Sequence, residues 1–375
     1  MILPAIDAQD QENTSDLWRQ EGILRYRQGC ASFLLTEKNY MKKIIALLLI
    51  TIMALASSIF AGELINGAGA TFPYPVYSEW ANEYHKFTGI KLNYQPTDSG
   101  GGIRQITART VDFGASDKPL TPEELAKNNL LQFPAVIGGV VPVVNIPGIK
   151  AGELKLDQEV ICKIYMGEIK NWNNEAIKRL NPAVSLPNHE ITVVHRSDLS
   201  GTTAMFTYYL SSVCSVWKEK VGYGISVNWP AGIGANGNGG VANYLQKAPN
   251  SIGYLEFAYA KQNDLSYTML KNRSDEFVEP SLESFEDAAA TAIFEPSNHF
   301  YLWLIDAPGK KSWPIAGATF ILLAKEKRNS NVKVIKFFDW AFKKGDNSAK
   351  KLNFVPLPEL LKSKIEDYWK LNGII

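Results

Sequence analysis

From residue 62 onward, short apolar runs alternate along the chain with amphipathic stretches. The apolar runs predict strands at 91–95, 113–116, 132–144, 191–196, 252–257 and 319–324. The amphipathic stretches, in which apolar residues recur every three or four positions, predict helices at 75–88, 102–109, 122–127, 157–166, 202–213, 241–246 and 331–344. This alternation is typical of an α/β protein whose sheets are covered by helices.

Two junctions that carry proline and glycine beside apolar runs divide this pattern, at 145–148 and 312–317. Such residues favour turns, so these are the expected places for the chain to pass between lobes, although they also mark ordinary turns. Two crossings imply that a second lobe is inserted into the first. We therefore expect lobe I to comprise 62–145 plus 317–375, and lobe II to comprise 146–316.

The segment 41–61 is interpreted as a secretory signal peptide. It begins Met-Lys-Lys and continues as the apolar run 44–56, which is too short for a comfortable membrane span. Small residues follow, and we expect cleavage after Ala61, with Ser58 as the alternative site. An uncleaved membrane anchor is the competing interpretation.

Residues 1–40 are polar and irregular and mix acids with bases, which is unusual ahead of a signal peptide. We interpret them as a non-native or disordered extension and expect translation to begin at Met41. Cys162 and Cys214 are the cysteines that remain after cleavage. They could pair in an oxidising compartment, but the sequence gives no distance between them, so both outcomes stay open.

The composition is that of a soluble globular protein, with 46% hydrophobic and 21% charged residues. It argues against a disordered chain and against a multispanning membrane protein. The formal net charge is only +1, so a surface that binds nucleic acid or another polyanion is not indicated. An anionic ligand would therefore have to be bound locally by a few hydrogen-bond donors or charged groups that point toward it.

Four loops rich in Gly, Ser or Thr each run directly into a predicted helix, at 67–73, 99–102, 200–203 and 237–240. Free N–H groups at a helix start, helped by the helix dipole, can bind an anion, and glycine lets the backbone approach closely. For any loop taken alone, plain N-capping is the simpler interpretation. Their recurrence beside charged residues favours a shared anion site.

Two charged positions support this hypothesis. Arg196 ends the predicted strand 191–196 just before the loop at 200–203, and Asp198 stands two residues on. An arginine can bind an oxyanion bidentately while an aspartate fixes the orientation of its guanidinium group. Asp117 directly follows the apolar strand 113–116, where a capped turn is the alternative interpretation.

Seven separated motifs keep a common order along the chain: GAGATFP at 67–73, SGGG at 99–102, VDFGASD at 111–117, FPAVIGGVVPVVNIPG at 133–148, IYMGEIKNWN at 164–173, HRSDLSGTT at 195–203 and SIGYLEFAYAKQN at 251–263. Together with WPI and FFDWA near the C-terminus, they resemble the phosphate-binding protein of the high-affinity phosphate ABC transporter. The match spans nearly everything after residue 62.

The resemblance implies a two-lobed periplasmic-binding-protein fold of type II, with inorganic phosphate in the cleft between the lobes. It also implies a periplasmic monomer without cofactor, metal or enzymatic activity, whose partner is an inner-membrane ABC permease. Carried over position by position, the expected phosphate-binding residues are Thr71, Phe72 (through its backbone), Ser99, Asp117, Arg196, Ser200, Gly201 and Thr202, with Asp198 orienting Arg196.

Two positions depart from the family pattern. Leu199 stands where glycine is usual, and a position that needed positive φ would be costly for leucine. His195 precedes the arginine where another basic residue is common. Leu199 therefore raises the question of whether the binding turn keeps its geometry.

The expected selectivity rests on Asp117. Near neutral pH phosphate still carries a proton that it can donate to a carboxylate, whereas sulfate offers only lone pairs and would be repelled. Alternatives are a secreted phosphatase or phosphoesterase on the same fold, or a binder of another oxyanion. The sequence lacks a HExxH motif, a GxSxG motif and a P-loop, and its four histidines are scattered, which disfavours catalysis.

Overall fold

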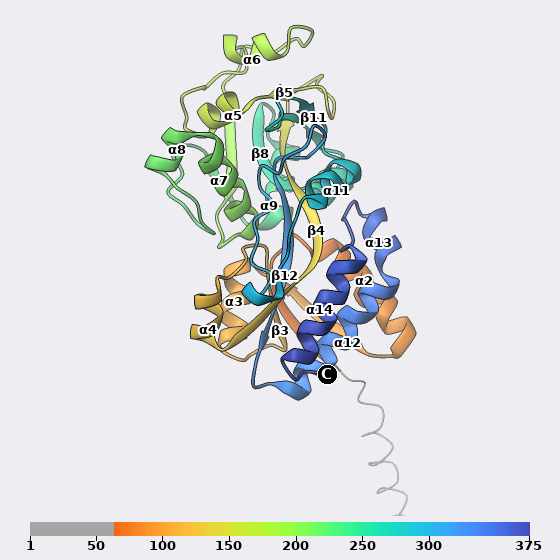
Figure 1. Cartoon of the computed structure of the whole chain (residues 1–375). Coiled ribbons are helices and arrows are strands. Elements are labelled where there is room, and N and C mark those ends of the chain that lie inside the picture. The colour runs from red at the N-terminus through yellow and green to blue at the C-terminus, as the bar shows by residue number, and fades with distance from the viewer. Residues whose placement is uncertain (1–63) are drawn as a thin grey trace, which may run out of the picture. The chain divides into compact units, whose positions relative to one another are not determined.

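The computed structural model of the chain describes residues 64–375 (Figure 1). The predicted extension at 1–40 and the predicted signal peptide at 41–61 lie outside the described residues. Among residues 64–375, no helix combines the length and apolar character that a membrane span requires.

The strands form a nine-stranded sheet in the order β2-β1-β3-β12-β4-β8-β6-β7, with β9 also paired to β4. Its strands are β1 (Leu64–Gly69), β2 (Lys91–Pro96), β3 (Phe113–Ser116), β4 (Leu130–Asn145), β6 (Thr192–Arg196), β7 (Ile233–Ala235), β8 (Ser251–Glu256), β9 (Ser266–Tyr267) and β12 (Ala316–Ala324). A small second sheet joins β5 (Lys155–Leu156), β10 (Met269–Lys271) and β11 (Phe277–Val278).

The long strand β4 connects two halves of this sheet. Its first part pairs antiparallel with β12 as far as Gly139, and its last part, from Val140, pairs antiparallel with β8. The first sheet half comprises β2, β1, β3, β12 and the part of β4 up to Gly139. The second sheet half comprises the part of β4 from Val140, together with β8, β6, β7 and β9. Figure 1 shows β4 running between the two groups of elements.

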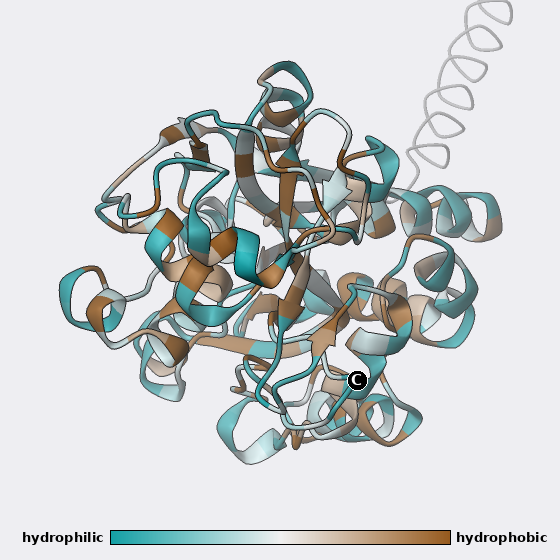
Figure 2. Ribbon diagram, turned by 90° about the horizontal axis from the view of Figure 1, so that it is seen from above, coloured by the Kyte–Doolittle hydropathy of each residue, from teal (hydrophilic) through white to brown (hydrophobic). Residues whose placement is uncertain are grey.

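Helices cover both halves. Beside the first half lie α2 (Tyr74–Thr88), α3 (Ser99–Thr107), α4 (Pro122–Asn128), α12 (Arg328–Lys344), α13 (Asp346–Lys351) and α14 (Glu359–Leu371). Beside the second lie α5 (Gln158–Tyr165), α6 (Glu175–Leu180), α7 (Gly201–Val213), α8 (Ser215–Lys220), α9 (Gly237–Lys247), α10 (Phe257–Gln262) and α11 (Leu282–Ala290), followed by the short η1 (Pro296–Asn298). The apolar strands lie inside and the polar helix faces outside (Figure 2).

The helices bury the apolar faces that the sequence periodicity predicts. In α2, Tyr77, Trp80 and Tyr84 are buried at spacings of three and four residues, which places them on one face. Tyr77 stacks on Trp80, and the Trp80 indole N–H donates to the Gly345 carbonyl at 2.9 Å. Aromatic packing therefore fixes α2 against α12 and α13, and sets the position of the loop that precedes α2.

All six predicted strands and all seven predicted helices are present, with ends shifted by a few residues. The strand β1 was missed because its glycines weaken a strand pattern. Both glycines are required by close approach: a Cβ on Gly67 would meet the Phe113 ring, and one on Gly69 would meet the Ala115 backbone. The helix α14 was also missed, although Leu361, Ile365 and Trp369 recur every four residues.

Cys162 and Cys214 form a disulfide that links α5 to the junction of α7 and α8. Their Cα atoms lie 6.4 Å apart, and 52 residues separate them in sequence. Closing a loop of this length removes entropy from the unfolded chain, a contribution of about 4 kcal/mol to stability. The bridge thus ties together helices of the second sheet half, and the question that the sequence left open is answered.

Candidate functional site

The residues predicted to bind an anion come from loops at the ends of strands in both sheet halves. From the first half come the loop after β1, the start of α3 and the turn after β3; from the second come the end of β6 and the start of α7. All are buried, and Thr71, at 8% exposed, is the most accessible of those with a side-chain polar group. Close contacts bring Ser99, Asp117 and Gly201 together. Others link Thr71 to Thr202 through Asn238.

Asp117 lies at the centre of this region and is 2% exposed. Its Oδ1 accepts a hydrogen bond from the Thr319 hydroxyl at 2.8 Å, and its backbone N–H donates to Ser99 Oγ at 3.2 Å. These contacts hold the carboxyl in place and engage Oδ1. Each carboxylate oxygen has two acceptor sites, so the carboxyl keeps capacity for a further donor.

Gly201 brings the start of α7 directly onto Asp117. A Cβ added at Gly201 would lie 2.7 Å from Asp117 Cβ and 2.8 Å from its Oδ2, and would also clash with Ser99 Oγ. No side chain fits there, so glycine is required by the close approach of the two sheet halves. The N–H groups at the start of α7 consequently lie beside the carboxyl and the Ser99 hydroxyl.

Arg196 is 3% exposed and is held by Asp198, as the sequence predicts. Nε donates to Asp198 Oδ1 at 2.7 Å, and Nη2 donates to Oδ2. Nη1 is buried and has no hydrogen-bond partner among the described residues. Because an unpaired buried guanidinium nitrogen is costly, this geometry is what a site for an anionic acceptor requires.

The turn between Arg196 and α7 accommodates Leu199 without left-handed backbone strain. Among the described residues, those with positive φ do not include Leu199, so the position imposes no left-handed strain. Its carbonyl accepts from the Gly100 N–H at 2.9 Å, and its side chain lies against Gly100 at the start of α3. Leu199 therefore contributes a contact between the sheet halves.

Ser200 caps α7, since its Oγ accepts from the Thr203 N–H at 3.0 Å. Capping was the simpler interpretation of this loop, and here it coexists with burial beside Arg196. An accepting serine oxygen still has its O–H to donate. Phe72 is fully buried and its ring packs edge to face on Phe354, so only its backbone is suited to a polar contact in the site.

Three further residues of the region were not predicted as site residues. Thr319 holds Asp117; the Tyr259 hydroxyl donates to the Thr71 carbonyl at 2.7 Å; and Asn238 donates to the Thr71 hydroxyl. Asn238 belongs to the loop at 237–240, which the sequence marks as one of four helix-start loops. Tyr259 lies within the motif at 251–263, whereas Thr319 sits in an apolar run that gives no polar signal.

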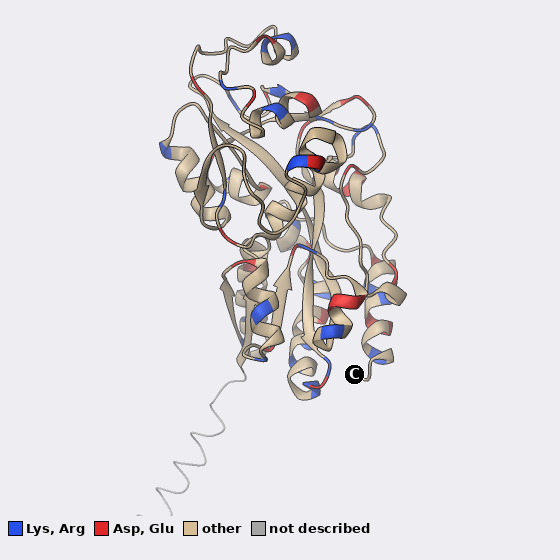
Figure 3. Ribbon diagram, turned by 90° about the vertical axis from the view of Figure 1, so that its left-hand side faces the viewer, with Lys and Arg blue, Asp and Glu red and all other residues tan. Residues whose placement is uncertain are grey.

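Burial raises the pKa of Asp117 to about 7. The hydrogen bond from Thr319 opposes this rise most strongly, followed by the positive charge of Arg196. Burial also raises the pKa of Glu256, at the end of β8, well above its usual value. The charge of Arg196 in this region is shared with Asp198. Basic and acidic residues are interspersed over the outer helices (Figure 3).

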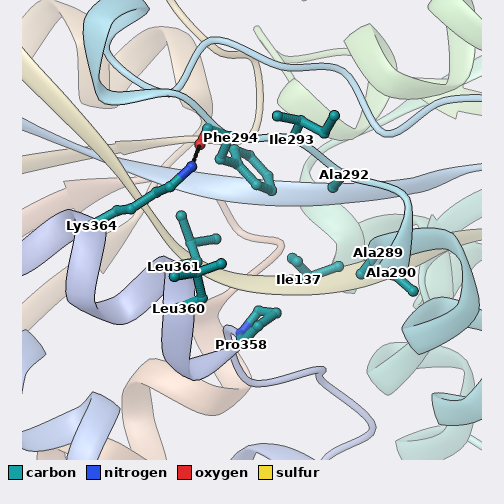
Figure 4. Close-up of a pocket in the computed structure, with 10 residues that line it drawn as sticks. All are labelled: Ile137, Ala289, Ala290, Ala292, Ile293, Phe294, Pro358, Leu360, Leu361 and Lys364. Carbon is teal, nitrogen blue, oxygen red and sulfur yellow. Dashed lines mark hydrogen bonds between the residues drawn. The ribbon is translucent and has the colours of Figure 1, made fainter.

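No group of three or more potential metal ligands occurs within the part of the chain that the structure describes. A separate groove of about 300 Å³ lies between the segment after α11 and the start of α14 (Figure 4). It is lined mainly by apolar side chains, and the ammonium of Lys364 is engaged by the Phe294 carbonyl and by Glu295. Unlike this groove, the buried region around Asp117 and Arg196 has donors suited to an oxyanion.

Comparison with known proteins identifies the family. The model of the PBP superfamily domain matches residues 54–344. The chain is 53% identical over 325 residues to the phosphate-binding protein PstS of Pasteurella multocida, covering 85% of this chain and 94% of the relative. It is 51% identical over 308 residues to PstS of Haemophilus influenzae, covering 82% and 92%.

Solved structures agree on the fold. A high-affinity periplasmic phosphate-binding protein, PfluDING, bound with phosphate at pH 8.5, aligns with a TM-score of 0.66 at 22% identity, covering 81% of this chain and 93% of that one. The expected two-lobed fold of periplasmic binding proteins is thereby confirmed. The chain belongs to the family of PstS phosphate-binding proteins.

Proposed function

We propose that this protein binds inorganic phosphate in the periplasm and delivers it to an inner-membrane ABC importer. The observation that carries the proposal is the buried Arg196 whose Nη1 is unpaired, in one region with Asp117 and the start of α7. The similarity to proteins named as phosphate-binding supports the choice of ligand. Periplasmic location rests on the predicted signal peptide and on the relatives.

The proposed ligands surround phosphate with donors. Arg196 contributes Nη1, and Gly201 and Phe72 contribute backbone N–H groups. The hydroxyl groups of Ser99, Thr71, Ser200 and Thr202 complete the set. Because the region is buried, each donor gains strength from the low dielectric, and each would be costly if left unpaired.

Asp117 is the proposed acceptor for a phosphate proton. Oδ2 faces the Gly201 backbone, where the ligand would meet the start of α7. A ligand that arrives with a proton satisfies this carboxylate, whereas sulfate has no proton to donate and presents only oxygens that the carboxylate repels. Asp117 is therefore the group through which the site prefers phosphate, because it is the one hydrogen-bond acceptor among the proposed donors.

Delivery requires the ligand to enter and leave, and we propose hinge motion between the two expected lobes, lobe I (62–145 plus 317–375) and lobe II (146–316). Residues 140–145 pair with β8 and are proposed to move with lobe II. Two passages support the hinge motion: β4, which changes partner between Gly139 and Val140, and the connection that enters β12. Contacts such as Gly100 to Leu199 would form on closure. The permease would then distinguish the closed form from the open form.

We propose that the protein is not an enzyme and acts as a monomer. A phosphatase would need a nucleophile paired with a base, and the hydroxyl of Ser200 instead caps α7. Incubation with an aryl phosphate tests for enzymatic activity, and no turnover is expected. Calorimetry with phosphate and sulfate tests the main proposal: tight phosphate binding and negligible sulfate binding are expected, and equal affinity for both anions would refute it.

A further inference from the structure

Asn238 is a fully buried asparagine at the second position of α9, and it contacts two of the proposed phosphate ligands. Its Nδ2 donates to Thr71 Oγ1 at 2.9 Å and to Thr202 Oγ1 at 3.3 Å. Its backbone N–H also donates to Thr71 Oγ1, at 3.3 Å. One side chain therefore joins a hydroxyl of the first sheet half to a hydroxyl of the second.

The orientation of this amide is fixed by its other end. Asn238 Oδ1 accepts from the backbone N–H of Glu256 at 3.0 Å. A backbone N–H can only donate, so the oxygen must face Glu256 and the NH2 group must face the threonines. The assignment of donor and acceptor therefore follows from the hydrogen-bond pattern.

This arrangement determines what the threonine hydroxyls can still do. A hydroxyl has one hydrogen to donate and two lone pairs to accept with. Thr71 Oγ1 accepts twice from Asn238, so its lone pairs are used and donation is its remaining capacity. Thr202 Oγ1 accepts once from the same amide, which biases it in the same direction.

We propose that Asn238 is a positioning residue for oxyanion affinity: it makes both threonine hydroxyls donors toward the oxygens of a bound oxyanion. The inference rests on the proposed phosphate site and deepens it. Hydroxyls that can only donate bind the deprotonated oxygens of the ligand, while Asp117 remains the group that accepts a hydrogen bond from the protonated oxygen. Asn238 acts through Thr71 and Thr202 and need not touch phosphate.

A double-mutant cycle tests the proposal by calorimetry with inorganic phosphate on the purified protein. Asn238→Ala is expected to raise the Kd for phosphate at least tenfold, because both hydroxyls lose the donors that orient them. In a background that carries Thr71→Val and Thr202→Val, the same change is expected to alter Kd less than threefold. Such non-additivity is expected of groups that act as a unit.

Asn238→Asp gives a second, nearly isosteric readout. A carboxylate at this position would accept from the two hydroxyls and turn their hydrogens away from the ligand, so Kd is expected to rise further than in Asn238→Ala. The matched control is Asn236→Ala, since Asn236 is exposed at the same helix start and its side chain makes no capping bond. This control is expected to leave Kd within twofold of wild type.

The outcomes distinguish failure of the proposed function from failure of the proposed role of Asn238. If wild-type protein fails to bind phosphate, the proposed function is refuted and this role falls with it. If wild type binds phosphate but the penalties of Asn238→Ala and of the valine substitutions simply add, the role of Asn238 alone is refuted. Lower thermal stability of Asn238→Ala with unchanged Kd would likewise show a purely structural residue and overturn the proposal.

Discussion

The substitution Asp117→Asn tests selectivity because it changes charge with little change in shape. Oδ1 can keep its contact with the Thr319 hydroxyl, whereas the Oδ2 position beside Gly201 becomes an NH2 donor. Phosphate thereby loses the acceptor for its proton, and sulfate loses the group that repels it. The two anions are therefore expected to respond in opposite directions.

The magnitudes follow from the geometry. A hydrogen bond to a charged group contributes about 1.5–3 kcal/mol, so phosphate affinity is expected to fall roughly 10- to 150-fold. Two unit charges about 4 Å apart at an effective dielectric constant of about 20 repel by about 4 kcal/mol. Because sulfate would gain part of this energy, its affinity is expected to rise at least tenfold.

Calorimetry with both anions measures the ratio of the two Kd values in wild type and variant. The wild-type ratio is also expected to depend on pH: burial raises the pKa of Asp117 to about 7, so sulfate should bind better at pH 5, where the carboxyl is protonated, than at pH 8. In Asp117→Asn this difference should vanish. A variant that retains the full wild-type preference for phosphate would refute the reasoning.

Three further predictions test neighbouring parts of the account. Gly201→Ala is expected to raise the Kd for phosphate at least tenfold in calorimetry, whereas Gly240→Ala, whose Cβ has room, should not. Replacing Cys162 and Cys214 together by serine should lower the unfolding free energy in urea by about 4 kcal/mol and leave Kd unchanged; equal stability would contradict this. Through Asp117, ligand-free protein should lose up to about 4 kcal/mol of stability between pH 4 and pH 8, since the folded state holds the Asp117 proton up to about pH 7. Asp117→Asn should remove this share of the slope and leave the share that comes from the buried Glu256.

Much of the fold could be predicted from the sequence, because long elements with strong periodicity decide their own type. The strands at 132–144 and 319–324 and the helix at 331–344 are examples. The strand β1 could not, because its glycines serve contacts with Phe113 and Ala115 that only the folded chain reveals. Local pattern carries no information about such close approach.

The candidate site, too, could be predicted from the sequence only in part. The resemblance supplied the ligand residues, and the loops at helix starts gave a physical reason for an anion site. The supporting residues Thr319, Tyr259 and Asn238 lie 202, 188 and 167 positions from their hydrogen-bond partners. Tyr259 and Asn238 reach Thr71 through the way the two sheet halves meet, whereas Thr319 reaches Asp117 because β12 pairs with β3. No local pattern predicts either arrangement.

The most direct test of the central claim is a crystal structure of the protein grown with inorganic phosphate. The account predicts one phosphate buried between the two sheet halves, with its oxygens within hydrogen-bond distance of Arg196 Nη1, the Gly201 N–H and Asp117. A phosphate bound elsewhere, or an Arg196 that turns toward solvent in the complex, would contradict it.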